Sequence, residues 1–226
     1  MNKRIVIVGA SQGIGAALVA HFAALPNTEV IALSRNLAKM QAAFEQSNVK
    51  SFALDISQNV HEQIKAIDVK GPIDILINNA GLLINKPFTE LTHQDFSESY
   101  QVNVIGIMEA TQAFLPLLAP NAHIVNISSM GGFQGSLKFA GLAAYSTSKA
   151  ALCAFTELFA EEFKATGIHM NCLCLGAVQT EMLEAAFPGY VAPTSALQMA
   201  AFIADFALQS GSFFNGKILP VSSTNP

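Results

Sequence analysis

Residues 5–15 read Ile-Val-Ile-Val-Gly-Ala-Ser-Gln-Gly-Ile-Gly, and this stretch decides the fold. Its first four residues form a continuous apolar run, which is typical of a parallel strand buried on both faces. The glycine-rich turn is followed by a helical pattern over residues 13–24, which ends before Pro26. A strand, a glycine-rich turn and a helix in this order indicate the first unit of an α/β fold.

Short β-branched runs and longer helical patterns alternate along the rest of the chain. We expect helices at residues 37–44, 145–165 and 194–209, a bent or interrupted one at 92–118, and a weak one capped by Ser57. We expect further strands at residues 30–33, 51–54, 73–77, 123–127, 170–175 and 217–221. With no linker or repeat, this alternation predicts one domain over residues 1–226, an α/β Rossmann-type doubly wound parallel sheet of six to seven strands flanked by helices. Its ligands should bind where the strands end.

The composition excludes several classes of protein. The chain has 226 residues, a formal net charge of −4, 51% hydrophobic residues and only 12% charged residues. A disordered chain has few hydrophobic and many charged residues, and a nucleic-acid-binding surface has an excess of cations, so the composition excludes both. The low charge also suggests apolar surface buried against another subunit, so we expect a homodimer or homotetramer.

The cysteines and the apolar stretches indicate the compartment. None of Cys153, Cys172 and Cys174 lies in a C-x-x-C motif, and the last two alternate along a strand as small hydrophobes. The first apolar run is too short for a signal peptide, and the uncharged residues 185–204 are broken by prolines. We therefore expect a cytoplasmic protein without a membrane segment.

The glycine-rich turn has the composition of a phosphate-binding loop. Glycines let the backbone approach a pyrophosphate, and the following helix presents free N–H groups to it. The alternative is a tight turn without a ligand. At the end of the second strand, Ser34 and Arg35 stand where NAD-specific sites carry an acidic residue. A guanidinium there would pair with the 2′-phosphate of NADP, so we expect NADP rather than NAD. The alternative is that Arg35 is a solvent-exposed residue at the start of a helix and binds no ligand.

A second group of polar residues can carry proton chemistry. Tyr145 and Lys149 are four residues apart on a predicted helix, so both side chains can face one ligand. A nearby ammonium lowers the pKa of a phenol, which could then exchange a proton with a carbonyl oxygen. A serine at the end of the preceding strand, in Ser128-Ser129, could hold the same oxygen.

Taken together, these motifs make the chain resemble the short-chain dehydrogenase/reductase family over essentially its whole length. The ordered set is Gly9-Ala-Ser-Gln-Gly-Ile-Gly15, Asp55, Asn78-Asn79-Ala80-Gly81, Asn103, Ser129, Tyr145-x-x-x-Lys149, Asn171 and Gly176-x-x-x-Thr180. The resemblance implies an oxidoreductase that moves hydride between a nicotinamide cofactor and a carbonyl or alcohol.

The resemblance also implies a role for each matching residue. Tyr145 would be the general acid/base, Lys149 would hold the nicotinamide ribose, and Ser129 would bind the substrate carbonyl. Asn103 would anchor a water that links Lys149 to solvent. The cofactor-binding residues would be Gly9, Ser11, Gln12, Gly13, Ile14, Gly15, Ser34, Arg35, Asp55, Ile56, Asn79, Ala80, Gly81, Val178 and Thr180, together with Tyr145 and Lys149. Structural roles, such as Asp55 capping a strand end, are the alternatives.

The chain departs from the family pattern in three places. Val8 replaces a threonine, Leu175 replaces a proline whose loss should loosen the next turn, and Ser129 and Tyr145 are a few residues further apart than usual. The inserted residues 131–141 are glycine-rich and should form a flexible flap beside the substrate. The long spacing and the short C-terminus resemble the C-factor-like and sniffer-like carbonyl reductase branch.

Other functions are less well supported by the sequence. The five histidines are scattered without metal-ligand spacing, so we expect no metal site, and Ser129 lacks a G-x-S-x-G context. A non-catalytic dinucleotide-binding regulator stays as the alternative, and an acyl-carrier-dependent reductase would need a basic patch. Apolar residues after the strands suggest a mostly apolar small-molecule substrate, although each could equally be core: Leu82, Leu83, Phe133, Leu142, Met182 and Phe187.

Overall fold

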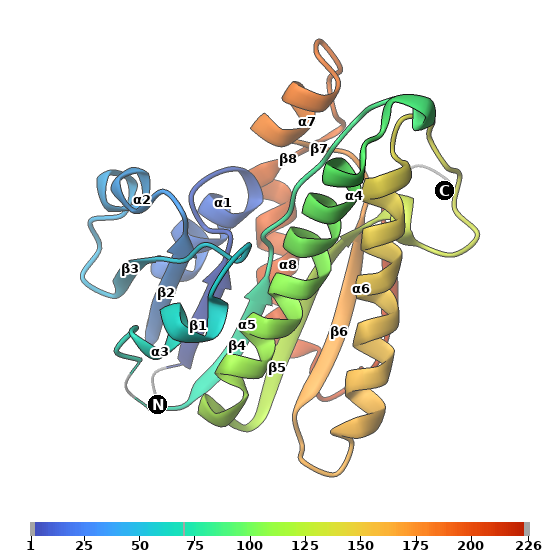
Figure 1. Ribbon diagram of the computed structural model, residues 1–226. Coiled ribbons are helices and arrows are strands. Elements are labelled where there is room, and N and C mark those ends of the chain that lie inside the picture. Colours follow the sequence, from blue (N-terminus) through green and yellow to red (C-terminus); the bar gives the residue numbers. More distant parts are fainter. Residues whose placement is uncertain (1–2, 70, 224–226) are drawn as a thin grey trace.

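The computed structural model describes residues 3–69 and 71–223, and its centre is a parallel sheet with helices on both faces (Figure 1). The sheet has seven strands in the order β3-β2-β1-β4-β5-β6-β9, and every neighbouring pair is parallel. The strands are β1 (Lys3–Val8), β2 (Thr28–Ser34), β3 (Val49–Ala53), β4 (Ile73–Asn78), β5 (Leu118–Ser129), β6 (His169–Leu175) and β9 (Ile218–Val221). The prediction of a doubly wound parallel sheet is confirmed.

Two layers of helices cover this sheet. The helices are α1 (Gly13–Ala23), α2 (Leu37–Ala43), α3 (Val60–Lys65), α4 (His93–Tyr100), α5 (Gly106–Phe114), α6 (Ala143–Glu162), α7 (Glu181–Ala186) and α8 (Ala196–Gln209). Two short strands, β7 (Val178–Gln179) and β8 (Thr194–Ser195), pair with each other outside the main sheet. In Figure 1, α7, β7 and β8 lie above the sheet, at the end where its strands finish.

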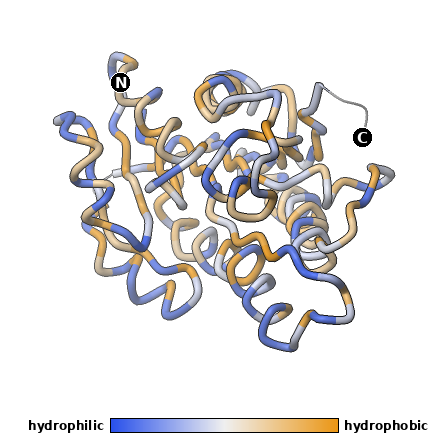
Figure 2. The backbone as a smooth tube through the Cα atoms, turned by 90° about the horizontal axis from the view of Figure 1, so that it is seen from above, coloured by the Kyte–Doolittle hydropathy of each residue, from blue (hydrophilic) through white to orange (hydrophobic). Residues whose placement is uncertain are grey.

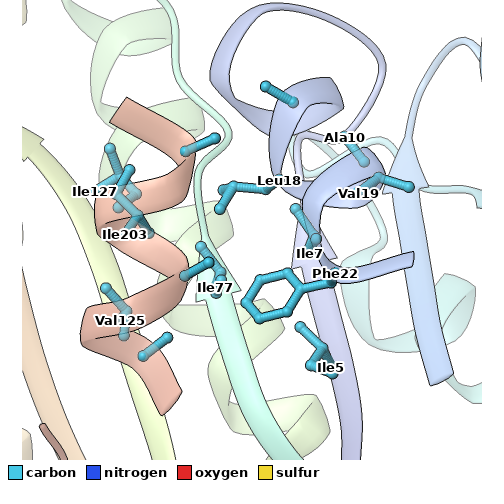
Figure 3. Close-up of a cluster of buried hydrophobic side chains, with 14 of the residues drawn as sticks. Ile5, Ile7, Ala10, Leu18, Val19, Phe22, Ile77, Val125, Ile127 and Ile203 are labelled. Carbon is cyan, nitrogen blue, oxygen red and sulfur yellow. The ribbon is translucent and has the colours of Figure 1, made fainter. Parts of the chain in front are cut away.

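The alternation of side chains along β1 divides the core into two parts. Ile5 and Ile7 point to one face and pack with α1 and α8 (Figure 3). Val6 and Val8 point to the other face and pack in the cluster formed by α3, α5 and α6. Because both faces are covered, β1 is continuously apolar over residues 5–8, as the sequence predicted, whereas the edge strand β3 is only partly buried.

The helical region expected at residues 92–118 is interrupted, as predicted: it consists of α4, a π-helical turn at Gln101–Ile105, α5 and a 3-10 turn at Leu115–Leu117. The structure corrects several other boundaries. Strand β5 spans Leu118–Ser129 rather than residues 123–127, and α6 spans Ala143–Glu162 rather than residues 145–165. The helix expected from residue 194 begins at Ala196, because Ser195 caps it in a capping box. Ser57 is not a helix cap: α3 begins at Val60, and the Ser57 hydroxyl instead donates to Asp55 Oδ1 at 2.6 Å.

The order of the strands determines where a ligand can bind. The chain runs outward from β1 to β2 and β3, and then returns to place β4 on the other side of β1. Such a reversal opens a crevice at the carboxyl ends of the strands. Figure 2 looks down on this end of the molecule and shows hydrophilic stretches mainly around its periphery.

Within residues 3–69 and 71–223, no helix combines the length and the apolar character that crossing a membrane requires.

Candidate active site

A cavity of about 780 Å³ lies at the carboxyl ends of the central strands. Of the residues predicted to bind cofactor or substrate, all except Gly15 and Asn103 line it. The lining residues from that set are Gly9, Ser11, Gln12, Gly13, Ile14, Ser34, Arg35, Asp55, Ile56, Asn79, Ala80, Gly81, Ser129, Tyr145, Lys149, Val178 and Thr180. The fold therefore gathers motifs from seven separate parts of the chain around one space.

The glycine-rich turn needs its glycines for two different reasons. Gly9 and Gly13 have φ angles of +89° and +54°, which residues other than glycine rarely adopt. Gly15 lies behind the turn, where a Cβ atom would come within 1.9 Å of the Gly9 carbonyl oxygen. Gly15 thus allows α1 to pack closely against the turn, and its place outside the cavity agrees with this structural role.

A pair of cations lies at the end of β2. Arg35 lines the cavity as predicted, and Lys39, which the sequence analysis did not identify, lines it beside Arg35 and donates to Gln12 Oε1 at 3.2 Å. The Ser34 hydroxyl donates to Ser11 Oγ at 2.8 Å and so joins β2 to the glycine-rich turn. This end of the cavity therefore carries positive charge that could meet a phosphate.

The end of β3 contributes a carboxylate to the same part of the cavity. Burial disfavours ionisation of Asp55, but hydrogen bonds from Ser57 and the nearby charge of Arg35 outweigh burial and lower the pKa of its carboxyl group. Asp55 is therefore ionised at neutral pH. Both the predicted ligand role and a strand-end cap are compatible with its contacts, because Ser57 uses one oxygen and Gln58 the other.

Ser129, Tyr145 and Lys149 meet at the centre of the cavity. Ser129 ends β5, and its side chain is near enough to the Tyr145 phenol, which projects from the first turn of α6, to lower the pKa of that phenol. Lys149 Nζ lies 6.0 Å from the centroid of the Tyr145 ring and donates to the Ile127 carbonyl oxygen at 2.8 Å. The spacing of four residues on α6 thus brings the phenol and the ammonium to one face, as predicted.

The protonation of this group differs from the sequence-based expectation. We expected the Lys149 ammonium to lower the pKa of the Tyr145 phenol, but burial raises that pKa, and the nearby Ser129 side chain offsets it only partly. Burial also lowers the pKa of Lys149 to about 8. Desolvation, which the sequence pattern does not show, therefore dominates both groups. At neutral pH the phenol keeps its proton and the lysine is mostly an ammonium.

Asn103 supports the site from behind, in the π-helical turn between α4 and α5. It is fully buried, and its amide donates to the Leu82 carbonyl at 2.8 Å and to Ser148 Oγ at 2.9 Å. Its side-chain oxygen accepts from the Leu82 N–H at 2.7 Å. The side chain thus joins the segment after β4 to α6, next to Lys149. Its predicted role as a water anchor stays a prediction.

The segment after β6 lines the cavity beside the glycine-rich turn, where Thr180 faces Gly13. Val178 and Thr180 line it, and the Thr180 hydroxyl accepts from the Leu183 N–H at 3.2 Å as the cap of α7. We expected Leu175 to loosen the following turn. The turn is nevertheless held, because the Gly176 N–H donates to the Val221 carbonyl at 2.9 Å.

Apolar side chains form the outer part of the cavity. Of the candidates named from the sequence, Leu83, Leu142, Met182 and Phe187 line it, whereas Leu82 and Phe133 do not. The sequence analysis missed Met130, Leu137, Phe139, Leu183 and Tyr190, which also line it. Leu183 lies in the short helix α7 and Met130 in a 3-10 turn, while the other three lie in loops. None belongs to a periodic pattern, so their only signal was their position after strand ends.

The three cysteines lie together beneath this site. Cys153, one turn after Lys149 on α6, has its sulfur 3.8 Å from Cys172 Sγ and 3.6 Å from Cys174 Sγ. All three side chains are buried, and Cys172 and Cys174 share one face of β6 as predicted. They could offer three sulfur ligands to a metal ion, which the sequence did not suggest because the ligands come from two distant elements.

A doubly wound sheet with this site at its carboxyl edge is the architecture of a Rossmann-type oxidoreductase. The model of the family described as short chain dehydrogenase matches residues 3–190. The chain therefore belongs to the short-chain dehydrogenase family. Its more specific resemblance to the C-factor-like and sniffer-like branch stays a prediction.

Curated relatives and solved structures agree with this assignment. Ketoacyl reductase HetN of Nostoc sp. is 32% identical over 192 residues, which cover 80% of this chain and 66%, just under two thirds, of that protein. Acetoacetyl-CoA reductase of Rhizobium meliloti is 30% identical over 190 residues, covering 82% of this chain and 78% of that protein. ElxO, solved with NADP bound, has a TM-score of 0.83 at 26% identity and covers 98% of this chain and 97% of its own.

Proposed function

We propose that this protein is an NADP-dependent reductase that interconverts a carbonyl compound and an alcohol. The observation that carries the proposal is the convergence of Ser129, Tyr145 and Lys149 in the cavity that the glycine-rich turn also lines. A serine hydroxyl, a phenol and an ammonium at that place can hold and protonate a carbonyl oxygen. The names of two relatives, a ketoacyl reductase and an acetoacetyl-CoA reductase, support the same reaction class.

The residues of the cavity fit a nicotinamide dinucleotide. At Gly9 and Gly13 an added Cβ would meet Ala80 and Thr180, so these glycines let the turn pack against the segments that follow β4 and β6. Both glycines line the cavity, where the N–H groups at the start of α1 could meet a pyrophosphate. Arg35 and Lys39 line the cavity where the 2′-phosphate of NADP would lie, and ElxO, with a similar fold, was solved with NADP. When bound, the nicotinamide supplies or accepts the hydride.

The side chains of this chain would manage the proton and the substrate. Ser129 would donate a hydrogen bond to the carbonyl oxygen and orient it toward Tyr145. Tyr145 would give its proton to that oxygen in reduction and remove it in oxidation. Because burial raises the pKa of Tyr145, the phenol carries the proton that reduction needs at neutral pH. Lys149 would bind the ribose hydroxyl groups and stabilise negative charge on the phenol.

The Tyr145→Phe variant separates this function from a non-catalytic dinucleotide-binding regulator. In the reductase, loss of the hydroxyl should lower kcat for carbonyl reduction by roughly 10²–10⁴-fold, which is the usual contribution of general acid catalysis. The Kd for NADPH, measured by fluorescence titration, should stay within about threefold, since the ring remains. Equal turnover in the variant and the wild type would contradict the proposal.

A further inference from the structure

The outer part of the cavity is built from three segments that hold one another in place. They are residues 82–86 after β4, residues 130–142, which contain the predicted flap at 131–141, and residues 181–190 around α7. The Lys86 N–H donates to the Gly141 carbonyl at 2.9 Å, and Asn85 Nδ2 donates to the Ala186 carbonyl at 2.9 Å. Within the flap, the Ser136 hydroxyl bonds the Phe133 carbonyl at 2.9 Å. These bonds give the outer cavity a defined wall before any substrate enters.

This wall presents large apolar side chains to solvent. Leu137 is 66% exposed, Phe139 63% and Tyr190 49%, although all three line the cavity. Leu142, Met182 and Phe187 continue the same surface inward. Exposed apolar side chains that converge on a cavity with a few polar groups are typical of a binding site for an apolar molecule. A bound substrate would cover the apolar surface that these side chains expose to solvent.

The charges around this wall do not favour an anionic substrate. Lys86 is held in an ion pair with Asp95 at 2.7 Å, and Lys138 Nζ donates to the Phe133 carbonyl and to Ser136 Oγ, both at 2.6 Å. The acidic Glu181 also lines the cavity. The cations that do line the cavity are Arg35 and Lys39 beside the glycine-rich turn, and the buried Lys149. Phosphate groups and acidic carrier proteins bind to cations that are free to pair with them. Lys86 and Lys138 are exposed, but the first is paired with Asp95, the second is bonded within residues 130–142, and neither lines the cavity.

We propose that the substrate is an uncharged, largely apolar ketone or aldehyde that binds free, and not an acyl group carried on coenzyme A or an acyl-carrier protein. The proposal rests on the carbonyl reduction proposed above and adds the substrate class. It separates this chain from the substrates that the names of its two relatives indicate. Leu137, Phe139 and Tyr190 would determine specificity by contacting the apolar body of the substrate.

The first test compares three 3-oxoacyl substrates, of which two share the acetoacetyl group and the third carries a phenyl group beside the ketone. We would measure kcat/KM with NADPH for acetoacetyl-CoA, ethyl acetoacetate and the bulkier ethyl benzoylacetate. We expect ethyl benzoylacetate to be at least about tenfold better than ethyl acetoacetate, and acetoacetyl-CoA to be the poorest of the three. A kcat/KM for acetoacetyl-CoA equal to or above that of ethyl acetoacetate would overturn the proposed substrate class. If neither NADPH nor NADH supports reduction of any of a broad set of carbonyl compounds, the proposed function itself fails.

The second test changes the wall and leaves the chemistry in place. Leu137→Ser and Phe139→Ser should each lower kcat/KM for ethyl benzoylacetate roughly tenfold, with little change for ethyl acetoacetate and none in the NADPH Kd. Leu197→Ser is the matched control, because Leu197 is 70% exposed but lies on α8 outside the cavity lining. An equal loss in the control, or an equal loss for both esters, would show that the wall does not select the substrate.

Discussion

Single residues set the charge at each end of the cavity. Arg35 and Lys39 carry positive charge beside the glycine-rich turn, and Lys149 carries it beside the phenol. Burial distinguishes the two ends: Lys149 is 4% exposed and its pKa is lowered to about 8, while Arg35 is exposed. Two predictions follow from these differences.

Replacing Arg35 by serine should change the choice of cofactor. A hydrogen-bonded contact with a charged group contributes about 1.5–3 kcal/mol, so kcat/KM for NADPH should fall roughly 10- to 100-fold. The value for NADH, which lacks the 2′-phosphate, should change little. Steady-state assays with both cofactors would check this. A wild-type enzyme that already prefers NADH would contradict the role given to Arg35.

The affinity for NADPH should fall as the pH rises through about 8. Because burial lowers the pKa of Lys149 to about 8, the ammonium is present below that pH and is lost above it. We therefore expect the association constant for NADPH to fall between about pH 7 and 9. The Tyr145→Phe variant should show the same decline, since the titrating group is the lysine. If the decline disappears in that variant, the phenol is the titrating group instead.

At the scale of elements, close packing joins the helices to the sheet at a few polar or very small residues. Gly15 lets α1 approach the glycine-rich turn. His123 on β5 connects β6 and α8, because its Nδ1 lies 3.0 Å from the Ala207 carbonyl and its Nε2 lies 3.0 Å from Asn171 Nδ2. Asn171, one of the residues of the family pattern, thus acts away from the cavity, as a bridge between neighbouring elements.

The Gly15→Ala variant should lose both stability and cofactor affinity. The added Cβ would meet the Gly9 carbonyl oxygen at 1.9 Å, so α1 must move away from the turn. We expect a loss of about 1–3 kcal/mol in the free energy of unfolding and a clear rise in the NADPH Kd. Gly135→Ala is the control: its φ of +81° makes alanine unfavourable, but nothing lies within 4 Å of the added atom. That variant should lose stability without losing NADPH affinity.

Acid should destabilise the protein through His123. Burial lowers the pKa of His123 to about 4, against about 6.5 in an unfolded chain. The unfolded state therefore binds more protons between these values, so the free energy of unfolding falls as the pH falls from about 6.5 to 4, by up to about 3 kcal/mol from this residue. Urea unfolding of His123→Gln should show a flatter pH profile over this range. His93→Gln, at an exposed position, should keep the wild-type profile.

At the scale of the whole molecule, apolar surface outside the cavity bears on assembly. Leu158 on α6 is 69% exposed, and Ile105 and Met108, near the start of α5, are 43% and 36% exposed. We expected a homodimer or homotetramer from the low charge of the chain, and the outer side of α6 is where we expect subunits to meet. Covering these side chains would remove apolar area from water.

Sedimentation velocity would test the predicted assembly. The wild type should sediment as a dimer or tetramer, and Leu158→Glu should shift it to a smaller species, because a buried unpaired carboxylate is costly. Leu197→Glu, on the exposed side of α8, should leave the assembly unchanged. A wild type that sediments as a monomer, or dissociation caused only by the α8 variant, would contradict this location.

Local patterns in the sequence predicted most of the fold and much of the site. Buried parallel strands must be apolar along their length, so β1 and β6 were evident from their residues alone. The spacing of Tyr145 and Lys149 placed both on one helical face, because the period of a helix is fixed. Element ends were less predictable: an interruption was expected in residues 92–118, but its place, the π-helical turn that contains Asn103, and the contacts of that side chain with Leu82 and Ser148 follow from no local pattern.

The sequence by itself determined the doubly wound sheet, the glycine-rich turn and the identity of the polar residues at the strand ends, since these depend on periodicity and on backbone conformations that few residues adopt. Only the tertiary structure decided the protonation of Tyr145 and Lys149, the meeting of three cysteines from α6 and β6, and the apolar wall of Leu137, Phe139 and Tyr190. Burial and proximity between distant segments control these features, and both arise only when the chain has folded.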